Sequence, residues 1–198
     1  MECDFTYKHY EYIIKEAKRR GYQIRRLMDY RKSFTKAIYL RHDVDFDVDC
    51  ALRLARLEKK LKVKSTYFFR LHAKNYNLFS DETILRVKEM QKMGHEIGLH
   101  YSSSFNNLKT EKEIFEKGLG IKINGFSIHE PSRTGLNIKN NTILYNAYDD
   151  KFFKKMKYLS DSGGRWREGC VCNHFDKNQI CLLTHAIWWY NKSPVENY

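Results

Sequence analysis

Ionisable side chains follow the apolar runs of this chain at six points. The first is Arg41-His42-Asp43-Val44-Asp45, directly after the apolar stretch 37–40. The remaining points have the same form: Arg70 and His72 follow 65–69, His100 follows 96–99, His129 follows 125–128, Asp161 follows 157–160, and His185 follows 179–184. Aspartate and histidine can supply metal ligands, a general base and a general acid, so this recurrence indicates metal-assisted hydrolysis.

Alternating strands and helices must position these residues. Strands are predicted at 37–40, 65–69, 96–99, 125–128 and 157–160, and a hairpin with arms 169–175 and 179–184. Helices are predicted at 7–20, at 48–61, between Ser80 and Gly94, from a capping box at 110–113, and around 142–148. Strand starts recur about every 30 residues, the length of a βα unit.

This order predicts a single α/β domain over 1–198, with the helix 7–20 packed on a mainly parallel sheet, open or closed into a barrel. Because the carboxyl ends of parallel strands lie at one edge, the polar residues should converge there. Asp43 and Asp45 are two positions apart, so on extended backbone they point the same way, one free to bind a cation and the other to act as a base. His100 and His129 are imidazoles of the kind that zinc, iron or cobalt prefer, and His185 can protonate a leaving group.

Composition limits the other possibilities. The chain has 198 residues, 42% of them hydrophobic, with 2 prolines and 10 glycines, which fits one folded domain. Its apolar runs are too short to cross a bilayer and its first residues lack a signal-peptide stretch, so a cytoplasmic location is expected. The net charge of +12 attracts polyanions, but the basic residues are spread along the chain, which favours a solvated surface over a nucleic-acid site.

The cysteines leave a second metal site open. There are five, and without an export signal they are expected to be reduced thiols. Cys170, Cys172 and His174 alternate, so an extended strand would put all three on one face, without an evident fourth ligand for zinc. We favour the other interpretation, small core residues on a hairpin strand.

Three motifs resemble those of the polysaccharide deacetylases, carbohydrate esterases with a NodB homology domain. They are Leu40-Arg41-His42-Asp43-Val44-Asp45, Gly94-His95-Glu96-Ile97-Gly98-Leu99-His100 and Leu183-Thr184-His185-Ala186-Ile187-Trp188-Trp189. The resemblance runs from about Ile38 to Trp189. It implies a distorted (β/α) barrel with six or seven parallel strands, and a metal-dependent activity that removes N- or O-acetyl groups from sugars.

The same resemblance implies roles for individual residues. Asp43 would be the catalytic base and Asp45 a metal ligand. His100 would be the first histidine of the metal-binding pair, and His185 the catalytic acid. Asp161 lies where the family has an acidic motif that orients catalytic groups.

The chain departs from the family at two places. The second metal histidine should come four positions after His100, where this chain has Ser104, a poor ligand for such cations. The family's Arg-x-Pro motif, whose arginine holds the catalytic aspartate, is replaced by His129-Glu130-Pro131. We therefore expect His129 to become the third ligand beside Asp45 and His100, for zinc or else cobalt, nickel or iron. The alternative is a decayed metal site.

Arginine and tryptophan residues near the site suggest a substrate. Arg165 would bind a phosphate, Trp166 would stack on a sugar, and Trp188 would wall the acyl pocket, although core packing explains each tryptophan equally well. A nucleotide- or lipid-phosphate-linked sugar of surface-polysaccharide synthesis fits these residues, with peripheral membrane contact. The rival functions are an inactive deacetylase-like protein that binds a sugar or a partner, and a nucleic-acid-binding module. His95 is expected to be structural and His42 to pack beside the site.

Overall fold

The sheet is parallel throughout and forms an open, distorted (β/α) barrel. The computed structural model describes residues 4–102, 107–136, 138 and 141–197. The strand order is β6-β5-β4-β3-β2-β8-β7, and β1 also pairs with β2. The strands are β1 Gln23–Arg25, β2 Ala37–Val44, β3 Thr66–Phe69, β4 Glu96–Tyr101, β5 Gly125–Ile128, β6 Tyr145–Asn146, β7 Lys157–Ser160 and β8 Gln179–Thr184. Within the described residues β6 and β7 are not paired with each other, so the seven-strand path stays open.

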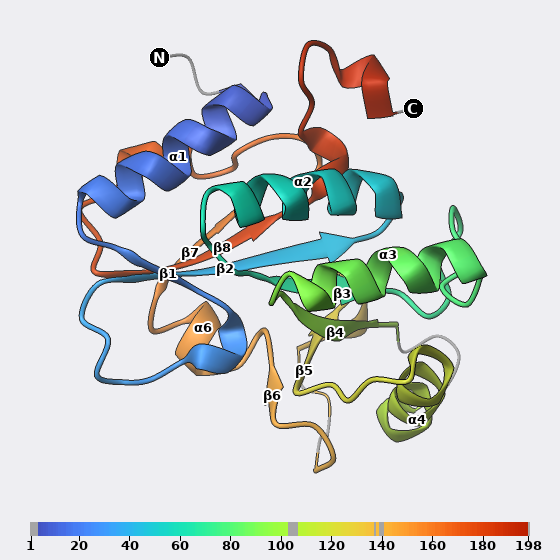
Figure 1. The fold of residues 1–198 in the computed structure, drawn as a ribbon. Helices are drawn as coiled ribbons and strands as arrows, with labels where there is room; N and C mark the ends of the chain where they lie inside the picture. Colours follow the sequence, from blue (N-terminus) through green and yellow to red (C-terminus); the bar gives the residue numbers. More distant parts are fainter. Residues whose placement is uncertain (1–3, 103–106, 137, 139–140, 198) are drawn as a thin grey trace.

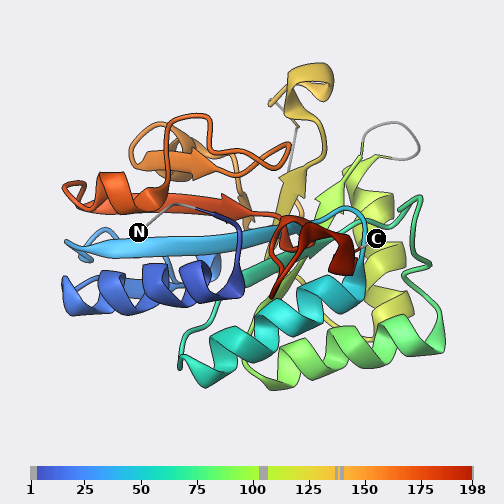
Figure 2. The same cartoon turned by 90° about the horizontal axis from the view of Figure 1, so that it is seen from above.

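Four long helices cover the sheet. They are α1 Tyr7–Arg19, α2 Val48–Lys60, α3 Asp81–Lys92 and α4 Leu108–Leu119. Figures 1 and 2 show α1, α2 and α3 on the same face of the sheet, with α2 beside α3. The shorter helical segments are η1 Leu27–Asp29, α5 Pro131–Thr134, α6 Asp150–Phe153, η2 Val171–His174, η3 Ala186–Trp188 and η4 Pro194–Asn197. In the described part of the chain, no helix is long and apolar enough to cross a membrane.

The central strand β2 is buried on both faces, as is typical of a parallel sheet. On the helix-covered face, Ile38 and Leu40 join the main hydrophobic core. On the opposite face, Tyr39 packs with Phe152 of α6 in a second, smaller core. Both faces of β2 therefore carry ordered side chains, and its odd-numbered residues point toward the inside of the barrel.

A buried carboxylate, Glu58 of α2, connects the helical layer to the sheet. It accepts hydrogen bonds from Tyr10 Oη at 2.6 Å, Ser65 Oγ at 2.7 Å and Tyr67 Oη at 2.7 Å. His42 Nε2 lies 2.9 Å from the same carboxylate. Four donors around one buried charge satisfy it, so α1, α2, β2 and β3 are held in one arrangement.

Most predicted strands and helices are present, but their ends differ. The first predicted strand, 37–40, continues to Val44, so Asp43 lies inside it. The helix predicted to open at the capping box 110–113 begins earlier, at Leu108, because Asn107 accepts a hydrogen bond from the Thr110 amide and is the N-cap. Strand β1 had no sequence signal, since it is three residues long.

Two predicted elements are wrong. In place of a helix around 142–148, Tyr145 and Asn146 pair with β5, and the Tyr145 ring lies where a side chain on Gly125 would be, 2.1 Å from its Cβ position. In place of the hairpin, residues 171–174 form η2, and β8 pairs in parallel with β2 and β7. The buried Val171 faces the main core, which the strand prediction did not anticipate.

Candidate active site

The carboxyl ends of five parallel strands carry the candidate residues. Asp43 lies near the end of β2 and Asp45 just beyond it, and His100 lies in β4. His129, Asp161 and His185 follow β5, β7 and β8 respectively. The amide of His129 donates to the Tyr101 carbonyl at 2.8 Å, which ties the end of β5 to that of β4.

Asp45, His100 and His129 form a compact group of potential metal ligands. Each offers one ligand atom, and these atoms all lie within 4.8 Å of one another. Asp45 Oδ1 lies 3.2 Å from His100 Nε2 and 3.7 Å from His129 Nε2, and the two imidazole rings meet edge to face. Asp45 Oδ1 is buried and has no hydrogen-bond partner among the described residues. One carboxylate and two imidazoles, with such an oxygen between them, fit a divalent cation of the zinc class.

Hydrogen bonds fix the orientation of His100. Its Nδ1 lies 2.6 Å from Ser127 Oγ, and that hydroxyl donates to Asp43 Oδ1 at 3.2 Å. A hydroxyl has one proton, so His100 Nδ1 must donate to Ser127 if Ser127 donates to Asp43. His100 Nε2 then keeps a free lone pair directed at Asp45, the tautomer that a metal ligand requires.

Asp43 is held by a buried arginine from its own strand. Arg41 Nη2 donates to Asp43 Oδ2 at 3.0 Å and to Tyr148 Oη at 3.0 Å, and Arg41 Nη1 donates to the Ala147 carbonyl. Burial opposes the charge of Arg41, but Asp43 outweighs it and keeps the pKa of the guanidinium well above its usual value. These roles of Arg41 and Ser127 were not predicted from the sequence. The two-residue spacing of Arg41 and Asp43 on one strand was the signal available for the first.

His185 and Asp161 form a second charged pair at the same edge. His185 Nδ1 lies 2.6 Å from Asp161 Oδ1, and the fully buried Asp161 also accepts bonds from the His185 amide and from Trp189 Nε1 at 3.0 Å. Burial acts to lower the pKa of His185, but the charge of Asp161 and its hydrogen bond outweigh burial and raise that pKa to about 9. The opposite nitrogen, Nε2, lies 3.8 Å from Asp45 Oδ2. A cationic imidazole therefore faces the three-residue group.

The charge balance of the group follows from these neighbours. Burial acts to raise the pKa of Asp45, but His100, His185 and His129 outweigh it and hold that pKa well below its usual value. The pKa of His129 is lowered by burial and by the nearby His100. An ionised carboxylate beside a neutral imidazole is the protonation pattern of a metal ligand set.

The proposed substrate residues lie in different surroundings. Trp188 follows His185 in η3, and its ring lies 6.4 Å from that of Phe46, the residue after Asp45. Trp166 instead stacks on Phe5 and meets Trp189 near its edge. Trp188 thus lies near the residue that follows Asp45, whereas Trp166 makes packing contacts with the N-terminal segment.

Some polar residues of the strand ends point away from the site. His72 Nε2 lies 2.8 Å from Glu111 Oε1 of α4. Arg70 of the same strand end lies close enough to His129 for its charge to lower the pKa of that imidazole. His42 points to the helix-covered face, where it contacts Glu58 and Thr184. His95 lies 3.2 Å from the Ala55 carbonyl, in the buried layer. Arg165 is exposed, and Ser104 lies outside the described residues.

Comparison with known proteins gives a likeness of fold. No protein-family model matches this chain, and no curated protein matches it. The chain is similar to a crystal structure described as that of a mutant of a CE4 family pseudoenzyme with restored enzymatic activity. The identity is 13% and the TM-score 0.41, over 79% of this chain and 58% of the other. The chain thus spans less than two thirds of that protein, and a function has to be inferred from this chain's own side chains.

Proposed function

We propose that the protein is a metal-dependent hydrolase that removes an acetyl or other short acyl group from a sugar. The observation that carries this proposal is the group Asp45, His100 and His129, whose ligand atoms lie within 4.8 Å of one another and beside the His185 imidazole. A bound zinc ion would polarise the acyl carbonyl and lower the pKa of water. Cobalt, nickel and iron suit the same ligands.

Two residues of the chain carry out the two proton transfers of the proposed reaction. Asp43, fixed by Arg41 and Ser127, accepts the proton of the attacking water. His185, whose pKa of about 9 keeps it protonated at neutral pH, donates a proton from Nε2 to the departing amine or alcohol. Asp161 holds the other nitrogen, so the acid keeps both its charge and its direction.

The substrate we propose is a phosphate-linked sugar, either nucleotide- or lipid-bound. The net charge of +12 attracts phosphate groups, and the exposed Arg165 follows Asp161 in the β7–β8 connection. The partly buried Trp188, with Phe46 beside it, offers an apolar surface next to His185 for a sugar ring or an acyl group.

Acetate release tests the activity. The purified chain is given zinc or cobalt and a panel of N- and O-acetylated sugars, free and phosphate-linked, and acetate is measured. We expect turnover by the unaltered chain and none by Asp43→Asn, which should still bind metal. Asp176→Asn, at an exposed aspartate of a surface turn, is the matched control and should leave turnover unchanged. Equal turnover by Asp43→Asn and the unaltered chain would refute the role of Asp43.

A deacetylase-like protein without catalysis is the second candidate. Ser104, at the position where the resemblance leads us to expect a metal histidine, favours it. Metal binding with no acetate release from any sugar of the panel, together with sugar binding, would favour this candidate over the first.

A further inference from the structure

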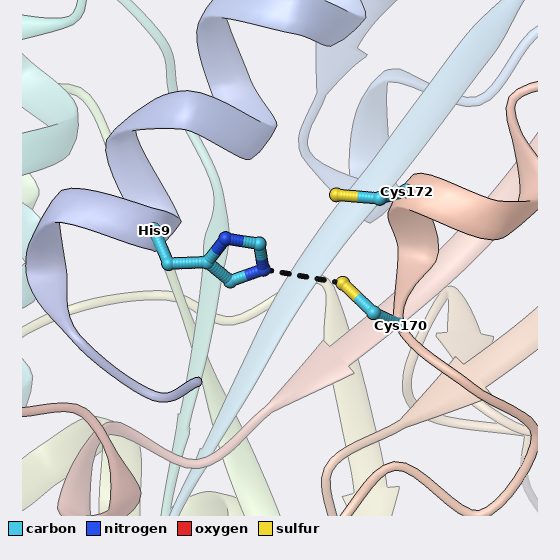
Figure 3. Close-up of side chains that lie close together, drawn as sticks. All are labelled: His9, Cys170 and Cys172. Atoms are coloured by element: carbon cyan, nitrogen blue, oxygen red, sulfur yellow. Dashed lines mark hydrogen bonds between the residues drawn. The ribbon is translucent and has the colours of Figure 1, made fainter. Parts of the chain in front are cut away.

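A second group of metal-ligating side chains, separate from the Asp45 group, is formed by residues of α1 and of the β7–β8 connection. His9 of α1, Cys170 and Cys172 each offer one ligand atom, and these atoms lie within 4.8 Å of one another. His9 Nε2 lies 3.3 Å from Cys170 Sγ, across 161 positions of sequence. Figure 3 shows both sulfur atoms directed toward the His9 ring.

The backbone presents these three side chains to one another. His9 is in the first turn of α1, where its amide donates to Thr6, the N-cap residue. Cys170 is the N-cap residue of η2, and Cys172 lies within it. His174, which an extended strand would have placed beside the cysteines, instead lies 2.7 Å from the Glu168 carbonyl. The structure thus supplies a histidine from α1 where the sequence pattern suggested His174.

The burial of these polar groups with few hydrogen-bond partners costs free energy. His9 and Cys170 are each 2% exposed, and His9 Nδ1 is buried with no hydrogen-bond partner among the described residues. Neither Cys170 nor Cys172 is joined in a disulfide, and thiols are weak hydrogen-bond donors. A buried imidazole with a thiol as its one hydrogen-bond partner is poorly satisfied, and a cation bound by nitrogen and sulfur would replace that contact with stronger bonds.

The spacing suits a tetrahedral cation. With Zn–S bonds of about 2.3 Å and Zn–N bonds of about 2.0 Å, two sulfur atoms lie about 3.8 Å apart and sulfur and nitrogen about 3.5 Å apart. The 3.3 Å contact and the 4.8 Å limit bracket these values, so no ligand atom needs to move by more than about 1 Å. Cys172 is half-buried, so water can reach the fourth position.

We propose that His9, Cys170 and Cys172 bind a zinc ion that fastens α1 to η2. Two thiol protons are released as the thiolates bind, and the imidazole binds as a neutral ligand. The role is structural, because the ion would join α1 to η2, which belongs to the β7–β8 connection that starts at Asp161. This site contains sulfur and the Asp45 group does not, so the two are separable by spectroscopy.

Cobalt binding tests the proposal on the full, reduced chain. Co²⁺ added to the metal-free protein should give a near-ultraviolet absorption from charge transfer between thiolate and cobalt, and zinc should displace it. Cys172→Ser and His9→Gln should weaken cobalt binding at this site by about 100-fold or more, since even indirect metal partners contribute 10- to 100-fold. Cys50→Ala removes a buried cysteine outside the group and should keep the band.

A second measurement needs no variant. Zinc should slow alkylation of Cys170 and Cys172 in the unaltered chain, as read by mass spectrometry of the peptides, and leave the rate at Cys50 unchanged. Absence of the thiolate band, or alkylation of Cys170 and Cys172 at the same rate with and without zinc, would overturn the proposal. Neither result would affect the Asp45 group, whose test is acetate release.

Discussion

Replacing Asp161 by asparagine should lower the fraction of His185 that is protonated at neutral pH. The substitution keeps the size of the side chain and an oxygen that can accept from His185 Nδ1 or Trp189 Nε1. It removes the negative charge that lies 2.6 Å from the imidazole. Because Asp161 is fully buried, no solvent screens that charge, and its loss should be felt almost entirely at His185.

The size of the effect follows from the pKa of His185. The rise from 6.5 to about 9 is about 2.5 units, or about 3.4 kcal/mol in favour of the imidazolium. Burial acts in the opposite direction, and only the weaker contributions of Asp43 and Asp45 remain in the variant, so without the Asp161 carboxylate the pKa of His185 should fall well below 9. At pH 7.5 about 97% of His185 should be protonated in the unaltered chain, and a clearly smaller fraction in Asp161→Asn.

Stability should show the same change with a defined sign. A pKa that is higher in the folded protein adds stability below about pH 6.5, and this contribution disappears as the pH rises through 9. The unaltered chain should therefore lose up to about 3.4 kcal/mol of unfolding free energy between pH 6.5 and 9 through this pair. The unfolding free energy of Asp161→Asn should change much less between pH 6.5 and 9.

Nuclear magnetic resonance of the imidazole protons measures the titration directly. The metal-free protein is titrated, the His185 signals are assigned by their loss in His185→Gln, and urea unfolding is followed at matched pH values. Asp176→Asn, at an exposed aspartate, serves as control and should leave the pKa of His185 near 9. The reasoning fails if His185 still titrates near 9 in Asp161→Asn.

Three further substitutions probe the fold around the site. Glu58→Gln should make the unfolding free energy less dependent on pH in acid. Burial acts to raise the pKa of Glu58 but its histidine partners lower it to about 2, so this group adds up to about 3 kcal/mol of stability above pH 4.5, which is lost as the pH falls through 2. An unchanged midpoint of acid unfolding would contradict this. Gly98→Ala puts a Cβ 2.5 Å from the Phe68 ring and should lower the unfolding free energy, measured in urea, by about 1–3 kcal/mol. A smaller decrease would contradict the expectation that the Phe68 ring is held in place. Arg41→Ala leaves Asp43 buried without its partner and should cost about 3–5 kcal/mol, so a calorimetric midpoint equal to that of the unaltered chain would disprove their coupling.

The strand pattern was predictable where apolar runs are short and separated by helices of clear periodicity. The segments 125–128 and 157–160 were predicted with their observed ends. The end of β2 was not, because Arg41, His42 and Asp43 are polar and yet fully ordered inside the sheet by partners elsewhere in the chain. A polar residue in a buried strand looks like a strand end when its partner is unknown.

Partners far apart in sequence account for the other differences. Tyr145 forms a strand because Gly125 leaves room for its ring, and no local pattern encodes that space. His9 meets Cys170 across 161 positions, so the sequence suggested His174 as the third ligand instead. Asp45, His100 and His129, by contrast, were expected to meet, because the carboxyl ends of parallel strands lie at one edge and the family resemblance made Asp45 and His100 metal ligands. Their roles stay predictions.

The carboxylate of Glu58 has a consequence for synthesis of the chain on the ribosome. Among the described residues, all of its hydrogen-bond partners lie between Tyr10 and Tyr67, so they emerge before strands β4 to β8. This buried charge can therefore be satisfied while the second half of the chain is still being made. Asp161 and His185 come last, so their pair forms only after β7 and β8 have joined the half-sheet that Glu58 already holds together.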